Sequence, residues 1–286
     1  MAYRYACADF TFPLLPHGDV LKLIGMMGFD GVDVGLFEER SHLRPSGEFC
    51  APASSGAELK KKAGDAGIVV ADAFLQSAFD FSVRAANHPS KAIREEERIR
   101  FRKLMEYASA AGSGHITCLP GVAFEGEAYE TSYGRALEEL AWRVEQAREA
   151  GLVFAVEAHL GSIADTPDRA GQLVADVPGL TLTLDYTHFT RIGIADEEIA
   201  PLIKYASHFH ARGAAEGRLQ TVVSENAINY DAVVAEMVKT GYHGFVGVEY
   251  TWQEWEGCNK TDNVSESILL MRQLKDAERK AQGMEE

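Results

Sequence analysis

The sequence is poor in cysteine and in positive charge. Lys and Arg together number 28 against 43 Asp and Glu, which gives a net charge of −15. A surface this negative repels phosphate backbones and anionic lipids, so neither nucleic acid nor a membrane is an expected partner. The few cysteines are far apart, with no pair at metal-ligand or redox spacing, which argues against a disulfide framework and a thiolate metal site. They are Cys7, Cys50, Cys118 and Cys258.

Long apolar runs are also missing. No run approaches the roughly 18 residues of a membrane span. The N-terminus lacks the basic segment, apolar core and small-residue cleavage site of a secretory signal. These absences predict a cytoplasmic protein.

Short apolar runs alternate with longer amphipathic segments along the whole chain. This pattern is typical of successive βα units around a parallel sheet, and 286 residues is close to the roughly 250 of an eight-unit barrel. The sequence predicts an α/β fold, a single (β/α)₈ TIM barrel that spans residues 1–286. The expected strands are Tyr5–Phe10, Gly31–Gly35, Ile68–Leu75, His115–Leu119, Leu152–Glu157, Leu180–Asp185, His208–Arg212 and Phe245–Glu249.

Helices are expected between these strands, most of them ending near a glycine suited to a left-handed C-terminal cap. Two connections, 37–55 and 75–92, are longer than a compact barrel needs, and both follow strands, so they should reach the face where barrel active sites are built. They are either lids or surface decoration. The expected helices are Asp19–Met27, Gly56–Ala66, Ile93–Ala111, Tyr133–Ala150, Pro167–Asp176, Glu197–Tyr205, Tyr230–Thr240 and a C-terminal helix over Asn263–Ala281.

Four late strands each end in a side chain that can bind a metal, namely Glu157, Asp185, His210 and Glu249. The C-terminal ends of parallel barrel strands converge on one mouth, so these groups should be neighbours although they are remote in sequence. Three carboxylates so close together would repel one another. A divalent cation removes that conflict, and oxygen donors with one imidazole favour Mn²⁺, with Mg²⁺ and Co²⁺ also open.

Strand alternation supports inward-facing acids, because residues two apart share a face. The positions beneath Glu157, Asp185 and Glu249 hold small residues, which leaves room in the barrel centre. His208 lies beneath His210 and is expected to pack in the core or to orient a ligand. His159 shares the parity of Glu157 and is expected in the same supporting role.

The motifs Val-Glu157-Ala-His159, Leu-Asp185-Tyr-Thr-His188, His210-Ala-Arg212 and Val-Glu249-Tyr resemble the sugar-phosphate isomerase/epimerase superfamily of xylose isomerase-like TIM barrels. The resemblance covers the whole chain. It implies that Glu157, Asp185, His210 and Glu249 bind the metal and that His188 contacts substrate. It also implies an arginine after the metal histidine, a place that either Arg212 or Arg218 could take, with Arg212 preferred because it shares the parity of His210.

The resulting hypothesis is a metal-dependent sugar isomerase or epimerase in which Glu157 and Glu249 move a proton at the carbon next to a chelated carbonyl. His188 and Arg212 would hold substrate oxygens. The expected substrate is a small sugar or keto-polyol, unphosphorylated, and a homo-oligomer is open. Aromatic residues expected to wall the pocket are Phe10, Phe12, Phe37, Trp252 and Trp255.

Three alternatives remain at this stage. A lyase on the same scaffold would expel a β-substituent, as an inosose-type dehydratase or a keto-glycoside deglycosidase does. A hydrolase resembling endonuclease IV would need more histidine ligands and affinity for DNA, against the charge of −15. A non-catalytic sugar-binding protein or partner subunit is the alternative of another class.

Overall fold

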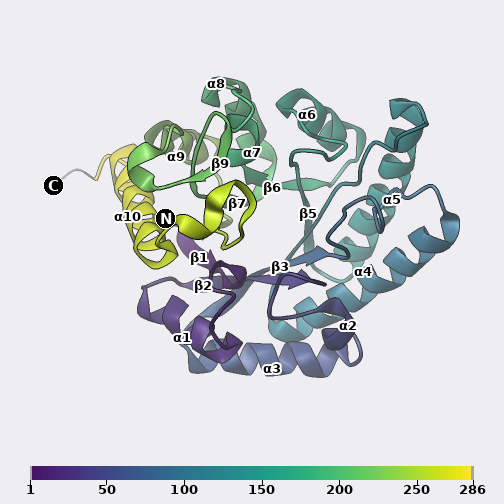
Figure 1. Ribbon diagram of the computed structural model, residues 1–286, viewed down its shortest axis with the longest axis horizontal. Helices are drawn as coiled ribbons and strands as arrows, with labels where there is room; N and C mark the ends of the chain where they lie inside the picture. Colours follow the sequence, from purple (N-terminus) through teal and green to yellow (C-terminus); the bar gives the residue numbers. More distant parts are fainter. Residues whose placement is uncertain (1, 285–286) are drawn as a thin grey trace.

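Eight parallel strands close into a barrel in the order β1-β10-β7-β6-β5-β4-β3-β2, with helices around it (Figure 1). The computed structural model describes residues 2–284. This confirms the predicted fold class, while Met1 and residues 285–286 lie outside the described part. The barrel strands are β1 (Arg4–Ala8), β2 (Gly31–Phe37), β3 (Val69–Gln76), β4 (His115–Cys118), β5 (Val153–Glu157), β6 (Thr181–Asp185), β7 (Ala206–Ala211) and β10 (Phe245–Val248).

The helices follow the predicted segments closely. Glycines 28, 67, 112, 151 and 241 adopt positive φ angles just after helices, as expected for left-handed caps. Among the described residues, no helix combines the length and the apolar character needed to cross a membrane. The α-helices are α1 (His17–Met26), α2 (Pro45–Glu48), α3 (Pro52–Asp65), α4 (Lys91–Ala111), α5 (Tyr129–Glu149), α6 (Pro167–Asp176), α7 (Thr187–Thr190), α8 (Asp196–Ile199), α9 (Tyr230–Thr240) and α10 (Asn263–Ala281).

Besides the one-turn helices α2 and α7, which the sequence did not predict, three segments differ from the sequence prediction. The helix expected over 197–205 is one α-helical turn, α8, followed by the 3₁₀ segment η2 (Ala200–Tyr205), because Pro201 has no N–H to continue the helix. The first strand ends at Ala8, and the next three residues form the 3₁₀ turn η1 (Asp9–Thr11). After β7 the chain forms an antiparallel hairpin of β8 (Gly213–Ala215) and β9 (Arg218–Thr221) that the sequence analysis did not predict.

The main apolar core lies between the strands and the surrounding helices, and it includes Phe101 of α4 and Leu270 of α10. Inside the barrel, the side chains change from apolar to polar along the barrel axis. Phe245 packs with Ala6 and Ala71 near the N-terminal ends of the strands. Polar side chains fill the level above, and the mouth opens beyond them.

The last helix closes the barrel by binding the first strand. The side chain of Glu278, near the end of α10, accepts hydrogen bonds from the backbone N–H of Tyr3 at 2.7 Å and from the hydroxyl of Tyr5 at 3.0 Å. Tyr3 directly precedes β1 and Tyr5 is its second residue, so both lie at the end of the barrel opposite the mouth. Residues near the two ends of the described chain are therefore direct neighbours.

Candidate functional site

The C-terminal ends of the strands bring together the four side chains that the sequence singled out. Glu157 ends β5, Asp185 ends β6, His210 lies in β7 and Glu249 directly follows β10. The Nδ1 atom of His210 is 2.9 Å from Glu157 Oε1 and 3.6 Å from Glu249 Oε2. Each of these three residues offers a ligand atom within 4.8 Å of the others, and so do Glu157, Asp185 and His188. Glu157 therefore joins two overlapping groups of donors.

The donor set fits a divalent cation. Glu157, Asp185, His210 and Glu249 are all almost completely buried. Within the described part of the chain, Glu249 Oε2 has no hydrogen-bond partner, although a buried acceptor of this kind is normally satisfied. Several carboxylate oxygens and one imidazole nitrogen form a set that suits Mn²⁺, Mg²⁺ or Co²⁺ and does not rank them.

Burial and mutual charge govern the ionisation of these groups. Burial raises the pKa of Glu249 to about 7, although Arg212 and His210 oppose the rise. Burial also disfavours charge on His210, but Glu249 and Glu157 outweigh it and raise the pKa of that imidazole to about 10. The histidine nitrogen that faces the acids therefore attracts positive charge strongly, and a cation would compete with a proton for it.

Arg212 is buried beside the acids. Its Nη2 donates to Asp185 Oδ2 at 2.7 Å and is 3.4 Å from Glu249 Oε2, and its Nε donates to the Thr187 hydroxyl at 3.0 Å. Arg218 is not brought to the site, which corrects the prediction that it contacts substrate. The hairpin of β8 and β9 carries it to the surface, where it pairs with Glu225 at 2.6 Å.

A cavity of about 630 Å³ opens above these residues. Glu157, His188, Arg212 and Glu249 line its floor, and the predicted Trp252 lines its wall and is 39% exposed. Phe12 was expected in this wall but packs in the main core, because the chain turns through η1 after β1. The aromatic residues that do line the cavity are Phe10, Phe37, Phe79, Phe81, Trp252 and Trp255.

The histidines near the site divide into two groups. His188 Nε2 lies 3.6 Å from Asp185 Oδ2 and 3.9 Å from Glu157 Oε2, facing the cavity. His159 also lines the cavity, and burial lowers its pKa to about 4, so it is neutral near pH 7. His208 points away from the mouth and bonds to Asp33 at 3.0 Å. His208 thus lies in the core beneath His210. Packing in the core is one of the two roles that the sequence analysis left open for it.

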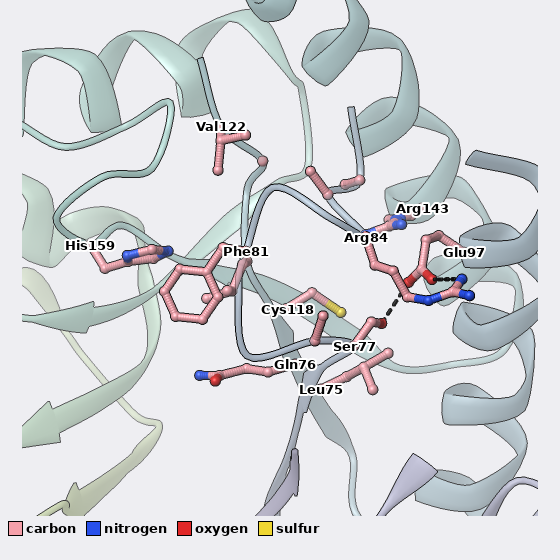
Figure 2. Close-up of a pocket in the computed structure, with 15 residues that line it drawn as sticks. Leu75, Gln76, Ser77, Phe81, Arg84, Glu97, Cys118, Val122, Arg143 and His159 are labelled. Carbon is pink, nitrogen blue, oxygen red and sulfur yellow. Dashed lines mark hydrogen bonds and ion pairs between the residues drawn. The ribbon is translucent and has the colours of Figure 1, made fainter. Parts of the chain in front are cut away.

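Both long connections reach the cavity. The segment after β2 contributes Arg40, and the segment after β3 contributes Phe79 and Phe81. Figure 2 shows how the second segment is fastened: Ser77 donates to the Glu97 carboxylate at 2.5 Å, and Phe81 packs edge-on against His159 with ring centroids 4.9 Å apart. Contacts with α4 and the β5 end therefore hold this wall in place.

Sequence reasoning missed three polar residues of the region. Asp33 interrupts an otherwise apolar strand, which was a readable signal, because an acid in such a position must find a partner. Arg40 and Arg191 line the cavity from loops, and no pattern in the sequence distinguishes them from surface arginines. Arg40 lies over the rings of Phe37 and Phe79, at 5.4 Å and 5.3 Å from their centroids.

Comparisons with solved structures show the same fold at low sequence identity. An L-ribulose 3-epimerase aligns with a TM-score of 0.77 and 15% identity, over 100% of this chain and 99% of the other. A probable 3-DHS dehydratase from Bacillus anthracis aligns at 0.68 and 15%, over 94% and 98%. A 3-keto-D-glucoside 4-epimerase from E. coli aligns at 0.69 and 13%, over 99% and 100%.

No curated protein matches the chain significantly. A family comparison does match, however, and it covers residues 21–274 under the description of a xylose isomerase-like TIM barrel. The match spans most of the chain and includes all four convergent side chains at the mouth. The chain therefore belongs to the xylose isomerase-like TIM barrel family.

Proposed function

We propose that this protein is a divalent-metal-dependent isomerase or epimerase that moves a proton at the carbon next to the carbonyl of a keto-sugar. The observation that carries the proposal is that Glu157, Asp185, His210 and Glu249 converge at one end of the barrel, where Glu157 and Glu249 also line the cavity. When bound there, a divalent cation would act as a Lewis acid on the carbonyl, an effect of several kcal/mol. The named relatives, two epimerases and a dehydratase, work on related chemistry and support the proposal by analogy.

Glu157 is suited to move the proton because its two oxygens face different groups. Oε1 lies 2.9 Å from His210 Nδ1, whereas Oε2 faces His188 at 3.9 Å on the cavity side. One oxygen can thus face the cation while the other reaches the substrate. Positioned acid–base groups of this kind contribute on the order of 10²–10⁴ in rate.

Glu249 and the neighbouring cationic groups complete the arrangement. Two carboxylates at one substrate carbon allow a proton to leave on one face and return on the other, which is epimerisation. A single carboxylate that returns the proton to the adjacent carbon gives isomerisation. Arg212 and His188 are placed to donate hydrogen bonds to substrate oxygens and to the negative charge that develops on the carbonyl oxygen.

A lyase that expels a substituent next to the same carbon is the second candidate. The cavity of about 630 Å³ and its six aromatic wall residues favour it, because they could accept a group attached to the sugar as well as the sugar itself. Cavities of about 300–1,000 Å³ usually take ligands of drug size. An aryl 3-keto-glycoside would place its sugar over Glu157 and its aryl group against the tryptophans.

The test is incubation of the Mn²⁺-loaded protein in D₂O with ketoses and, separately, with aryl 3-keto-glycosides. Deuterium in a recovered sugar supports isomerisation or epimerisation, and release of the aryl alcohol supports elimination. Glu157→Gln should abolish whichever reaction is found, whereas Glu149→Gln, at an exposed position of α5, should not alter it. If Glu157→Gln retains turnover, Glu157 does not move the proton and the proposed mechanism is wrong. If no substrate is altered although sugars bind, a non-catalytic binding function replaces the proposal.

A further inference from the structure

Beneath the candidate metal ligands, a buried carboxylate faces two histidines. Asp33 of β2 bonds through Oδ2 to His208 Nε2 at 3.0 Å, and the same oxygen lies 3.8 Å from His210 Nε2. Each of the three side chains is only 1% exposed. Since β2 and β7 are not adjacent in the barrel, these contacts cross its interior.

His210 thus meets acids on both edges of its ring. Nδ1 faces Glu157 and Glu249 at the mouth, while Nε2 points down towards Asp33. Within the described residues, Nε2 has no hydrogen-bond partner, and Asp33 Oδ1 has none either. A separation of 3.8 Å is too long for a hydrogen bond and too short for an intervening water, so a small shift of either side chain would join the two groups.

Strand β10, which only β1 separates from β2, leaves room for this carboxylate. Gly247 of β10 faces Asp33, and a Cβ built on that glycine would lie 1.9 Å from Asp33 Oδ2 and 3.2 Å from His208 Nε2. Any side chain at position 247 would therefore displace the acid. The absence of a side chain there is what allows the carboxylate to sit under His210.

We propose that Asp33 is a positioning residue for the metal centre: its carboxylate accepts a hydrogen bond from the Nε2–H of His210, which keeps the Nδ1 lone pair directed at the cation. His208 holds Asp33 from the other side through their 3.0 Å hydrogen bond. The inference rests on the proposed metal-dependent function. A ligating histidine whose second nitrogen donates to a carboxylate has a fixed tautomer and ring orientation and is a more basic ligand.

A second cation held by Asp33, His208 and His210 is the competing interpretation, since their donor atoms also lie within 4.8 Å of one another. The direct Asp33–His208 hydrogen bond argues against it, because a cation between the two atoms would replace that bond. It would also require His210 to bind metal through both nitrogens. The ion count per chain separates the two interpretations.

The chain offers a matched control inside the same barrel. Asp72 of β3 bonds to His115 Nδ1 at 2.6 Å, and the His115 ring lies 5.2 Å from the His208 ring. Asp72 is as deeply buried as Asp33, but its hydrogen bond to His115 involves no candidate metal ligand. Asp72→Asn should therefore reproduce the general cost of changing a buried carboxylate in this interior without affecting His210.

The first experiment measures Mn²⁺ binding by calorimetry for the wild type and for Asp33→Asn, Asp33→Ala and Asp72→Asn, with circular dichroism as a check of folding. We expect one ion per chain in the wild type, an affinity about 10–100-fold lower in both Asp33 variants, and near-normal affinity in Asp72→Asn. Equal losses in the Asp33 and Asp72 variants, or none in a folded Asp33 variant, would overturn the positioning role. Two ions per chain with one lost in Asp33→Asn would replace it by a second metal site.

The second experiment needs no variant and applies even if the Asp33 variants do not fold. Nitrogen-15 NMR of the Mg²⁺-loaded wild type should show His210 with its proton on Nε2 and the metal on Nδ1. Metal ligation through Nε2 would contradict the proposal. A wild type that binds no divalent cation would overturn the proposed function itself, which distinguishes that failure from a failure of the Asp33 inference alone.

Discussion

Replacement of Gly247 by alanine tests the packing beneath the site directly. The new methyl group would lie 1.9 Å from Asp33 Oδ2, whereas real Cβ atoms essentially never come closer than 3.0 Å to another heavy atom. The carboxylate or the β10 backbone must therefore move by more than 1 Å. Overpacking of this kind costs about 1–3 kcal/mol, and loss of the buried Asp33–His208 hydrogen bond adds about 1.5–3 kcal/mol if one partner is charged.

Together these effects predict that Gly247→Ala destabilises the protein by roughly 3–5 kcal/mol, a large part of the 5–15 kcal/mol typical of a folded domain. In scanning calorimetry the melting temperature should fall by about 5–10 °C. Gly64→Ala is the control, because a Cβ at that position of α3 meets nothing within 4 Å. It should stabilise the helix by about 0.5–1 kcal/mol. If Gly247→Ala has the same melting temperature as the wild type, Asp33 does not lie against β10 and this explanation is wrong.

Three further predictions concern the site and its surroundings. Arg212→Lys should lower turnover about 10–100-fold, because hydrogen bonds to charged groups contribute about 1.5–3 kcal/mol, whereas Arg218→Ala, which removes an exposed ion pair, should leave steady-state kinetics unchanged. Burial lowers the pKa of His115 against the opposing effect of Asp72, so the unfolded chain binds more protons and the free energy of unfolding should decrease as pH falls below about 6.5. Urea titrations at several pH values should show a smaller decrease for His115→Gln. Mn²⁺ at about 100 times its dissociation constant should add about 2.7 kcal/mol of stability, and a chelator should reverse the gain in melting temperature; an unchanged melting temperature would mean that no site exists.

The fold was predictable because its signals are local and repeated. Each apolar run of β5, β6 and β10 is short and bounded, and each intervening helix is amphipathic and ends near a glycine. The β8–β9 hairpin was not predictable in the same way. Its residues carry weak strand propensity, and it forms against α7 and η4 (Trp255–Lys260), contacts that only the folded chain creates.

The site was predictable at the strand ends and much less so elsewhere. Glu157 and Asp185 follow apolar strands, so topology alone places their side chains at the mouth. Strand parity favoured Arg212 over Arg218, and in the structure Arg212 does donate a hydrogen bond to Asp185. Arg218 does not face the acids, because the β8–β9 hairpin carries it to the surface. Arg40 reaches the cavity from a loop whose path no periodic pattern encodes.

The hydrogen bond between Tyr3 and Glu278 has a practical consequence for attaching the protein to a fusion partner or a solid support. Because this contact lies on the closed side of the barrel, polypeptide that continues from either end emerges away from the opening through which ligands pass. A fused partner, a purification tag or a solid support joined there would leave diffusion into the mouth unobstructed. The proximity of these residues also suits joining the two ends of the described chain by a short linker and cutting the chain in an exposed loop instead.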